Sequence, residues 1–151
     1  MTQTAAHDWE LWSTTARLVV TDAPALEPAL ALVRETLAEI ELAASRFRPD
    51  SEVMRLAASV HGNDRVGPVA ISPMLADLLG EALDAAEWTG GAVDPTVGST
   101  LSDLGYDRDI TMLDLSGDRP VVRVRRTPGW RTVRLTGTTL ALPAGLILDL
   151  G

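Results

Sequence analysis

A stripe of apolar side chains between residues 26 and 44 constrains the fold of this chain more than any other feature of the sequence. Its members recur at alternating spacings of four and three residues: Leu26, Leu30, Val33, Leu37, Ile40 and Ala44. This spacing places them on one face of an α-helix, which must pack against other elements. Pro24 suits the first turn of such a helix, and Pro49 disfavours helical geometry at Arg48. We therefore expect a long amphipathic helix that ends near Ser45.

Shorter elements are predicted on both sides of this helix. The patterns indicate strands at residues 10–21, 66–71, 121–126, 130–135, 139–142 and 146–150, and helices at residues 51–56, 73–89 and 95–105. Thr136-Gly137 suits a hairpin turn. This order predicts an α+β fold, with helices packed on one side of a largely antiparallel sheet. The last segment is apolar on nearly every residue and needs cover on both faces. We therefore expect residues 1–151 to be the N-terminal part of a single domain that is C-terminally incomplete.

Composition excludes several classes of function. The chain has 151 residues and a formal charge of −8, which argues against general nucleic-acid binding. It contains no cysteine, so disulfides, thiolate metal sites and thiol nucleophiles are excluded. No apolar run reaches the roughly 18 residues of a membrane helix, and the N-terminus lacks the pattern of a signal peptide. We expect a cytoplasmic protein with no membrane span.

A polar, turn-rich segment, residues 43–56, directly follows the long helix. It places Phe47 between Arg46 and Arg48. An aromatic side chain between two arginines can stack on a planar ring while the arginines meet phosphate. The alternative is that Phe47 continues the core stripe and the arginines complement the C-terminus of the helix.

A second segment of this kind, residues 89–98, contains Gly90-Gly91 and Asp94. The glycines let a ligand approach backbone N–H groups, and Asp94 can accept a hydrogen bond from a ribose or a base. The alternative is that Asp94 only caps its own helix. The local chemistry identifies no catalytic residue. No metal site made by this chain alone is expected, because its carboxylates are scattered or used as caps.

Three segments, in order, resemble the FAD:protein FMN transferase family, the flavin transferases related to ApbE. Residues 43–56 resemble the family's Ser-x-aromatic-Arg-x-x-Ser-Glu segment, and residues 89–98 resemble its Gly-Gly-x-Asp-x-Thr-x-Gly segment. Residues 148–151 resemble the start of its Leu-Asp-Leu-Gly-Gly-x-x-Lys-Gly segment. The resemblance implies an ApbE-like fold and an enzyme that binds FAD with Mg²⁺ and moves FMN to a threonine hydroxyl of a partner flavoprotein. It also implies that most Mg²⁺ ligands lie beyond Gly151, so we expect this chain alone to be inactive.

The resemblance also implies a set of cofactor-binding residues. Six residues stand at or near the family's FAD-contacting positions: Trp12, Phe47, Ala92, Val93, Asp94 and Asp149. Among them, Phe47 takes the aromatic position of the flavin pocket, and Trp12 stands where the family often has a methionine near FAD. Two other interpretations stay open, a flavin- or nucleotide-binding module without catalysis and a structural interaction domain.

Overall fold

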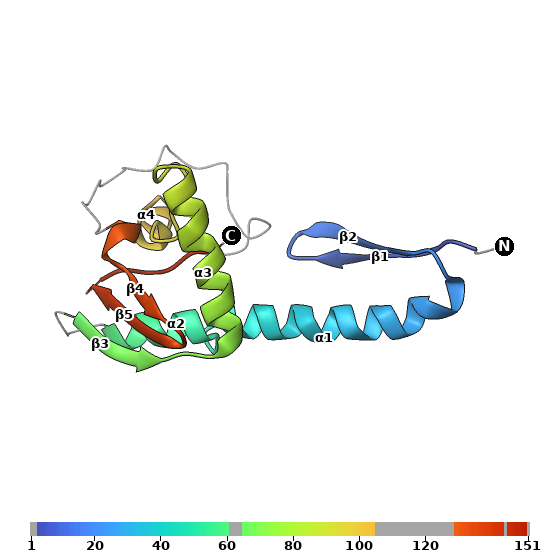
Figure 1. The fold of residues 1–151 in the computed structure, drawn as a ribbon, viewed down its shortest axis with the longest axis horizontal. Coiled ribbons are helices and arrows are strands. Elements are labelled where there is room, and N and C mark those ends of the chain that lie inside the picture. The colour runs from blue at the N-terminus through green and yellow to red at the C-terminus, as the bar shows by residue number, and fades with distance from the viewer. Residues whose placement is uncertain (1–2, 61–64, 105–128, 144, 151) are drawn as a thin grey trace.

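The computed structural model describes residues 3–60, 65–104, 129–143 and 145–150, and Figure 1 shows their arrangement. The strands are β1 (Ala5–Leu11), β2 (Thr14–Val20), β3 (Arg65–Ala70), β4 (Arg134–Thr136) and β5 (Thr139–Pro143). The helices are α1 (Leu26–Ala44), α2 (Glu52–Val60), α3 (Pro73–Trp88) and α4 (Gly98–Asp103), with 3₁₀ turns η1 (Ala23–Ala25) and η3 (Trp130–Thr132). All described strand pairs are antiparallel. The predicted α+β class is therefore confirmed.

Helix α1 has the length and the end that the apolar stripe predicts. It runs from Leu26 to Ala44, and Ser45 leaves helical geometry with a ψ of 124°. Only Leu30 and Ala43 are buried along its length, while the rest of the stripe is half-buried. The helix extends away from the body of the molecule as an arm (Figure 1). Its C-terminal end is the part that enters the core.

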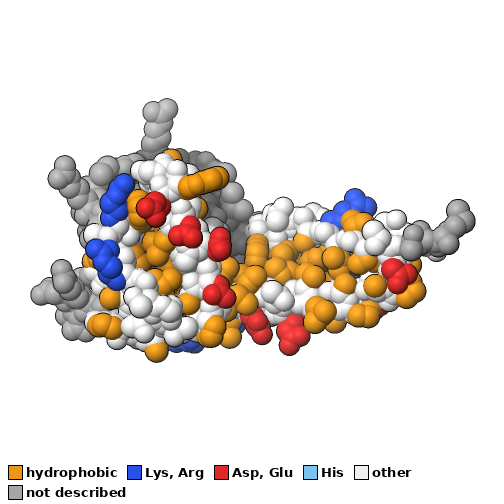
Figure 2. Space-filling model, in the orientation of Figure 1, with side chains coloured by type: hydrophobic (Ala, Val, Ile, Leu, Met, Phe, Trp, Pro, Cys, Tyr) orange, Lys and Arg blue, Asp and Glu red, His pale blue; other side chains and the backbone are white. Residues whose placement is uncertain are grey.

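The single strand predicted over residues 10–21 is wrong, because the structure folds this region into a hairpin. Strands β1 and β2 pair through the turn at Trp12-Ser13, whose φ angles are 47° and 61°. A two-residue hairpin turn requires such left-handed geometry, which Gly and Asn usually supply. Neither Trp nor Ser signals it in a sequence. The hairpin lies along α1, and hydrophobic side chains show along the seam between them (Figure 2).

The core lies where the sheet β3-β5-β4 meets the helices α2 and α3 and the end of α1. Its buried members are Ala43, Val53, Leu56, Ile71, Leu75, Ala76, Leu79, Val133, Leu140, Leu142, Leu146 and Leu148. Each buried leucine stabilises the fold by about 1.5–3 kcal/mol relative to an exposed one. Helix α3 begins as predicted, since the side chain of Ser72 accepts a hydrogen bond from the N–H of Leu75 and Pro73 is the first helical residue.

Two predicted strands near the C-terminus differ from the structure. Residues 130–132 form the 3₁₀ turn η3, in which the N–H of Thr132 donates to Gly129 O, so β4 begins only at Arg134. Residues 146–150 are not a strand of either described sheet. They run beside the loop before α4 and are held by two backbone hydrogen bonds described below. The predicted turn at Thr136-Gly137 is confirmed, because Thr136 pairs with Thr139 across Gly137, whose φ is 55°.

The short helix after residue 94 begins later than predicted. Helix α4 starts at Gly98 rather than at Pro95, because Asp94 closes a local turn with Thr96 instead of capping a helix. The strand predicted at residues 121–126 lies outside the described residues. No described helix is long and apolar enough to cross a membrane.

Candidate functional site

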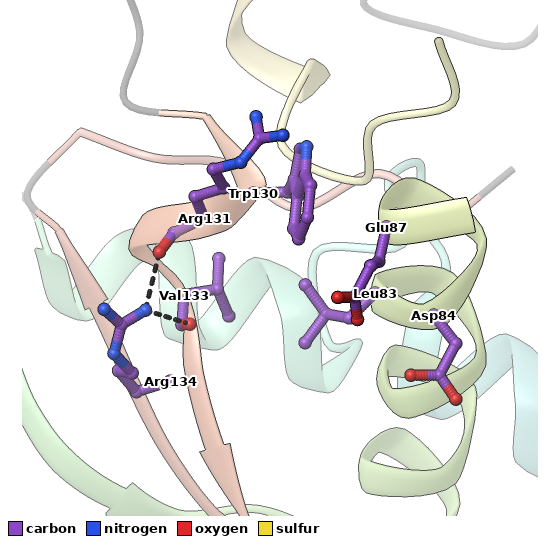
Figure 3. A pocket seen from close by; sticks show the side chains of 7 residues that line it. All are labelled: Leu83, Asp84, Glu87, Trp130, Arg131, Val133 and Arg134. Carbon is purple, nitrogen blue, oxygen red and sulfur yellow. Dashed lines mark hydrogen bonds between the residues drawn. The ribbon is translucent and has the colours of Figure 1, made fainter. Parts of the chain in front are cut away.

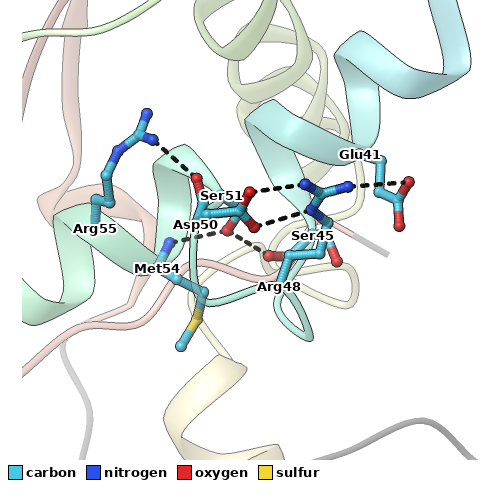
Figure 4. Close-up of polar contacts among 7 residues, drawn as sticks. All are labelled: Glu41, Ser45, Arg48, Asp50, Ser51, Met54 and Arg55. Atoms are coloured by element: carbon cyan, nitrogen blue, oxygen red, sulfur yellow. Dashed lines mark hydrogen bonds and ion pairs between the residues drawn. The ribbon is translucent and has the colours of Figure 1, made fainter.

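The first segment forms a tight connection between α1 and α2. Ser51 is fully buried, and its hydroxyl donates to Ser45 O at 2.6 Å while accepting from the N–H of Met54 at 3.3 Å. On the outer side, the guanidinium of Arg48 binds Asp50 at 2.7 Å (Figure 4). Hydrogen bonding to Arg48 lowers the pKa of the Asp50 carboxyl below its ordinary value. The polar residues of this segment thus fix its shape.

Glu52 of the same segment ties α2 to α3. Its Oε1 accepts from the N–H of Ser72 at 2.8 Å, and its Oε2 accepts from the Ser72 hydroxyl at 2.5 Å. That hydroxyl in turn accepts from the N–H of Leu75. The Ser-Glu pair of the first segment therefore shapes the fold, as a helix cap and as a link between helices.

The second segment begins at the end of α3 and exposes its middle. Gly90 and Gly91 both have positive φ angles, of 63° and 90°. Ala92 and Val93 follow as exposed residues, and Val93 is 54% exposed. Asp94 then uses one oxygen, Oδ1, to accept from both the N–H and the hydroxyl of Thr96, at 2.9 and 2.6 Å. This turn leaves the exposed pair and the glycine backbone at the surface.

The third segment joins the other two. The N–H of Asp149 donates to Pro95 O at 2.9 Å, and the N–H of Gly98 donates to Ile147 O at 3.2 Å. The carboxylate of Asp149 forms an ion pair with Nε of Arg46 at 2.8 Å. We call the meeting place of these residues the motif junction; it comprises Arg46, Pro95, Gly98, Ser102, Ile147 and Asp149.

Glycine is required where the second and third segments meet. A Cβ added to Gly98 would lie 2.7 Å from Ile147 O, closer than real side chains come. A second close approach occurs at Gly91, where a Cβ would lie 3.0 Å from Nε1 of Trp130. The Ile147 backbone at Gly98, and the positive φ and the Trp130 side chain at Gly91, explain glycine at these positions more directly than ligand contact does.

Apolar side chains remain exposed on the first two segments and on α4. Phe47 is 44% exposed, beside the guanidinium of Arg46, which lies 5.1 Å from its ring centroid. Val93, Val97 and Leu104 are also exposed. A planar apolar ring could pack against such side chains. Phe47 is therefore accessible and does not continue the core stripe.

Five of the six predicted cofactor-binding residues lie on segments that the structure brings together. Phe47 adjoins Arg46 of the motif junction, and Ala92, Val93 and Asp94 precede Pro95 of the same junction. Asp149 is inside the junction, with its carboxylate bonded to Arg46. Trp12 lies on a separate element, at the hairpin turn, where it is 52% exposed. Among the described residues, no hydrogen bond joins Trp12 to the junction.

Sequence reasoning missed the role of Trp130 and its surroundings. Its ring stacks under the guanidinium of Arg131 at 4.4 Å and lines a shallow groove of about 380 Å³ (Figure 3). Asp84 and Glu87 of α3 form the acidic wall, and Arg131 and Arg134 form the basic wall opposite. Trp130 directly after Gly129 was the available signal for a turn at this position. The β-propensity of the segment indicated a strand instead.

No cluster of three or more metal-binding side chains occurs within the described part of the chain. The one carboxylate of the motif junction, that of Asp149, already binds the guanidinium of Arg46. The described residues therefore do not by themselves fit a Mg²⁺ site.

Comparison with known proteins identifies the family. A model of the ApbE family matches residues 12–151. The structure is similar to the apo form of the flavinyl transferase ApbE of Pseudomonas stutzeri, with a TM-score of 0.71 and 20% identity, over 99% of this chain and 50% of that one. It is also similar to a mutant of the flavin transferase ApbE of Vibrio cholerae, with a TM-score of 0.72 and 23% identity, over 98% and 51%.

An ApbE protein of Thermotoga maritima is similar as well, with a TM-score of 0.71 and 22% identity, over 98% of this chain and 47% of that one. No curated protein matches the sequence. This chain thus spans about half the length of the solved structures that it resembles. Because the family match extends from residue 12 to residue 151, the chain belongs to the ApbE family.

Proposed function

We propose that residues 1–151 are the N-terminal part of a flavin transferase domain that moves FMN from FAD to a threonine hydroxyl of a partner flavoprotein. One observation carries this proposal. The three segments that resemble the family's FAD-contacting segments meet at the motif junction, through Arg46, Asp149, Pro95 and Gly98. Membership in the ApbE family and the likeness to flavin transferases also support the proposal.

The exposed residues beside the junction suit the two ends of a flavin nucleotide. Phe47 and Val93 offer apolar surface for the isoalloxazine ring. Gly90, beside which no other atom lies within 4 Å of an added Cβ, lets a ligand reach the backbone closely. Asp94 uses Oδ1 for Thr96. We assign its second oxygen, Oδ2, as an acceptor for a ribose or base group of FAD.

Mg²⁺ is part of this proposal only at the level of the family. The described residues do not fit a site for the ion, as stated above. The role of the described residues is to bind and orient FAD.

A flavin-binding module without catalysis is the second candidate function. The observation that favours it is the internal use of the segments' polar side chains. The side chains of four of these residues already bind other residues of the chain: Ser51, Glu52, Thr96 and Asp149. No described side chain of these segments is placed as a nucleophile or general base.

Titration with FAD of the wild-type chain and the Asp94→Asn variant tests the proposal. Asparagine keeps an Oδ1 that can accept both bonds from Thr96, so the melting temperature without flavin should not change. Loss of the charged acceptor should weaken FAD binding by about 1.5–3 kcal/mol, or ten- to a hundredfold. Asp77→Asn, which changes an exposed carboxylate on α3 away from the groove, is the matched control and should bind FAD as the wild type does.

Equal FAD affinity in the Asp94→Asn and wild-type proteins would show that Asp94 is purely structural. The release of AMP from FAD in the presence of Mg²⁺ separates the two candidate functions. FAD binding with AMP release supports the transferase. FAD binding without it, in a protein that also includes the second half of the family's length, supports the binding module.

A further inference from the structure

The side chain of Arg46 connects the first segment to the third segment and to α4. It lies at the C-terminal end of α1, and its side chain is only 6% exposed. Its Nε binds Asp149 Oδ2 at 2.8 Å, and its Nη1 donates to the hydroxyl of Ser102 on α4 at 3.4 Å. That hydroxyl donates to Gly98 O at 3.0 Å. One guanidinium therefore reaches the third segment and the helix that follows the second segment.

We propose that Arg46 is a positioning residue for flavin binding. It holds the Asp149 carboxylate in a fixed direction and so locks the third segment against the first and second. This inference rests on the proposed function, because it assigns to Arg46 the arrangement that receives FAD. Arg46 acts through Asp149 and Phe47 and contacts no reacting atom.

The burial of the ion pair supports a role in orientation more than one in stability. The side chain of Asp149 is 14% exposed, so both charges are largely removed from water. The cost of desolvation offsets much of the attraction in such pairs, and their net contribution to stability is small. What a planar guanidinium supplies instead is geometry, because its N–H groups point in fixed directions. The carboxylate is held on one side while the Asp149 N–H is held by Pro95 O.

The same guanidinium also sets the surroundings of Phe47. Its central carbon lies 5.1 Å from the Phe47 ring centroid, within the range of a cation–π contact. The N–H of Phe47 donates to Ser45 Oγ at 3.3 Å, which fixes the backbone at this position. A change at Arg46 should therefore disturb both the aromatic ring and the Asp149 carboxylate.

The chain offers a matched control for an arginine–aspartate pair. Nε of Arg17 binds Asp8 at 3.3 Å on the β1–β2 hairpin, with both side chains more than half exposed. In both pairs the arginine Nε contacts a carboxylate oxygen of an aspartate, and the pairs differ in burial and in place. Arg17→Lys therefore reports the effect of an arginine-to-lysine change away from the motif junction.

The test compares FAD affinity, by flavin fluorescence, in the wild type, Arg46→Lys, Asp149→Asn, the double variant and Arg17→Lys. Lysine keeps the charge but cannot reach Asp149 and Ser102 together, so Arg46→Lys should bind FAD about tenfold more weakly. The double variant should bind no more weakly than the weaker single variant, because the two residues act as one unit. Arg17→Lys should bind as the wild type does. Wild-type affinity in Arg46→Lys, or losses that multiply in the double variant, would overturn the proposal.

Hydrogen exchange gives a readout that does not depend on FAD. The N–H groups of Asp149 and Gly98 bridge the second and third segments. Both amides should exchange about tenfold faster in Arg46→Lys than in the wild type. In Arg17→Lys their exchange rates should equal those of the wild type. If the wild type does not bind FAD, the proposed function fails for this chain, and the locking role of Arg46 is decided by exchange alone. Unchanged exchange at both amides in Arg46→Lys would then overturn it.

Discussion

Replacement of Gly98 by alanine should destabilise the chain through a single steric conflict. Gly98 is the first residue of α4, and its φ lies outside the left-handed region, so alanine is conformationally acceptable there. The added Cβ would lie 2.7 Å from Ile147 O and 2.9 Å from Ile147 Cγ2, against 3.4 Å or more for ordinary contact. The carbonyl cannot retreat freely, because the next peptide unit is bonded to Pro95 O through the N–H of Asp149.

Two opposing terms set the size of the effect. Overpacking that forces a backbone shift costs about 1–3 kcal/mol. The lower backbone entropy of alanine in the unfolded state returns about 0.5–1 kcal/mol. We therefore expect Gly98→Ala to lower the free energy of unfolding by about 1–2 kcal/mol. The separation of the second and third segments should also weaken FAD binding.

Urea unfolding followed by circular dichroism measures this change. Gly80→Ala is the matched control, because it makes the same substitution inside α3, where the nearest atom to the new Cβ is Leu135 Cδ2 at 4.0 Å. That contact is ordinary, so Gly80→Ala should stabilise the chain by about 0.5–1 kcal/mol. The reasoning is refuted if Gly98→Ala is as stable as the wild type while Gly80→Ala behaves as expected.

Three further changes test other parts of the structure. Ser72→Ala removes both the acceptor for the N–H of Leu75 and the hydroxyl that donates to Glu52, and it should cost about 2–4 kcal/mol of stability in the same assay. Phe47→Ala should change stability by less than about 1 kcal/mol because the ring is half exposed, yet should abolish most flavin binding in a fluorescence titration. Arg48→Gln should raise the pKa of Asp50, measured by NMR, toward its ordinary 3.8. Since the folded pKa of Asp50 is depressed, the contribution of this pair is present above pH 3.8 and is lost as pH falls below it; a pKa that does not move would contradict the assignment.

The long helices could be predicted from the sequence because their signals are local. The stripe from Leu26 to Ala44 and the Ser72-Pro73 start each specify a helix without reference to the rest of the chain. The hairpin turn at Trp12-Ser13 could not be predicted, because neither residue type signals the left-handed geometry that both adopt.

The candidate site shows the same division. The three segments could be found by their residues, and Phe47 proved accessible, as a ring-stacking position requires. The ion pair between Arg46 and Asp149 could not be predicted, because the two residues lie far apart in the sequence. Only the packing of the whole fold brings them together. The strand predicted at residues 146–150 is not observed, because its backbone partners also lie far away in the sequence. Its apolar residues are buried as predicted for Leu146 and Leu148, but the backbone bonds to a loop rather than to a sheet.

The internal bonds of the three segments bear on how sequences of this kind should be compared. Ser51 and Thr96 fix the shapes of their own segments, while Glu52 and Asp149 each bind a different part of the chain. Any chain that builds the same meeting of segments needs such residues, whether or not it handles flavin. A sequence pattern made of these residues therefore indicates a common fold, but it does not identify the reaction. Relatives with different activities should differ at the accessible positions between these bonded residues. Phe47 is the clearest of these accessible positions.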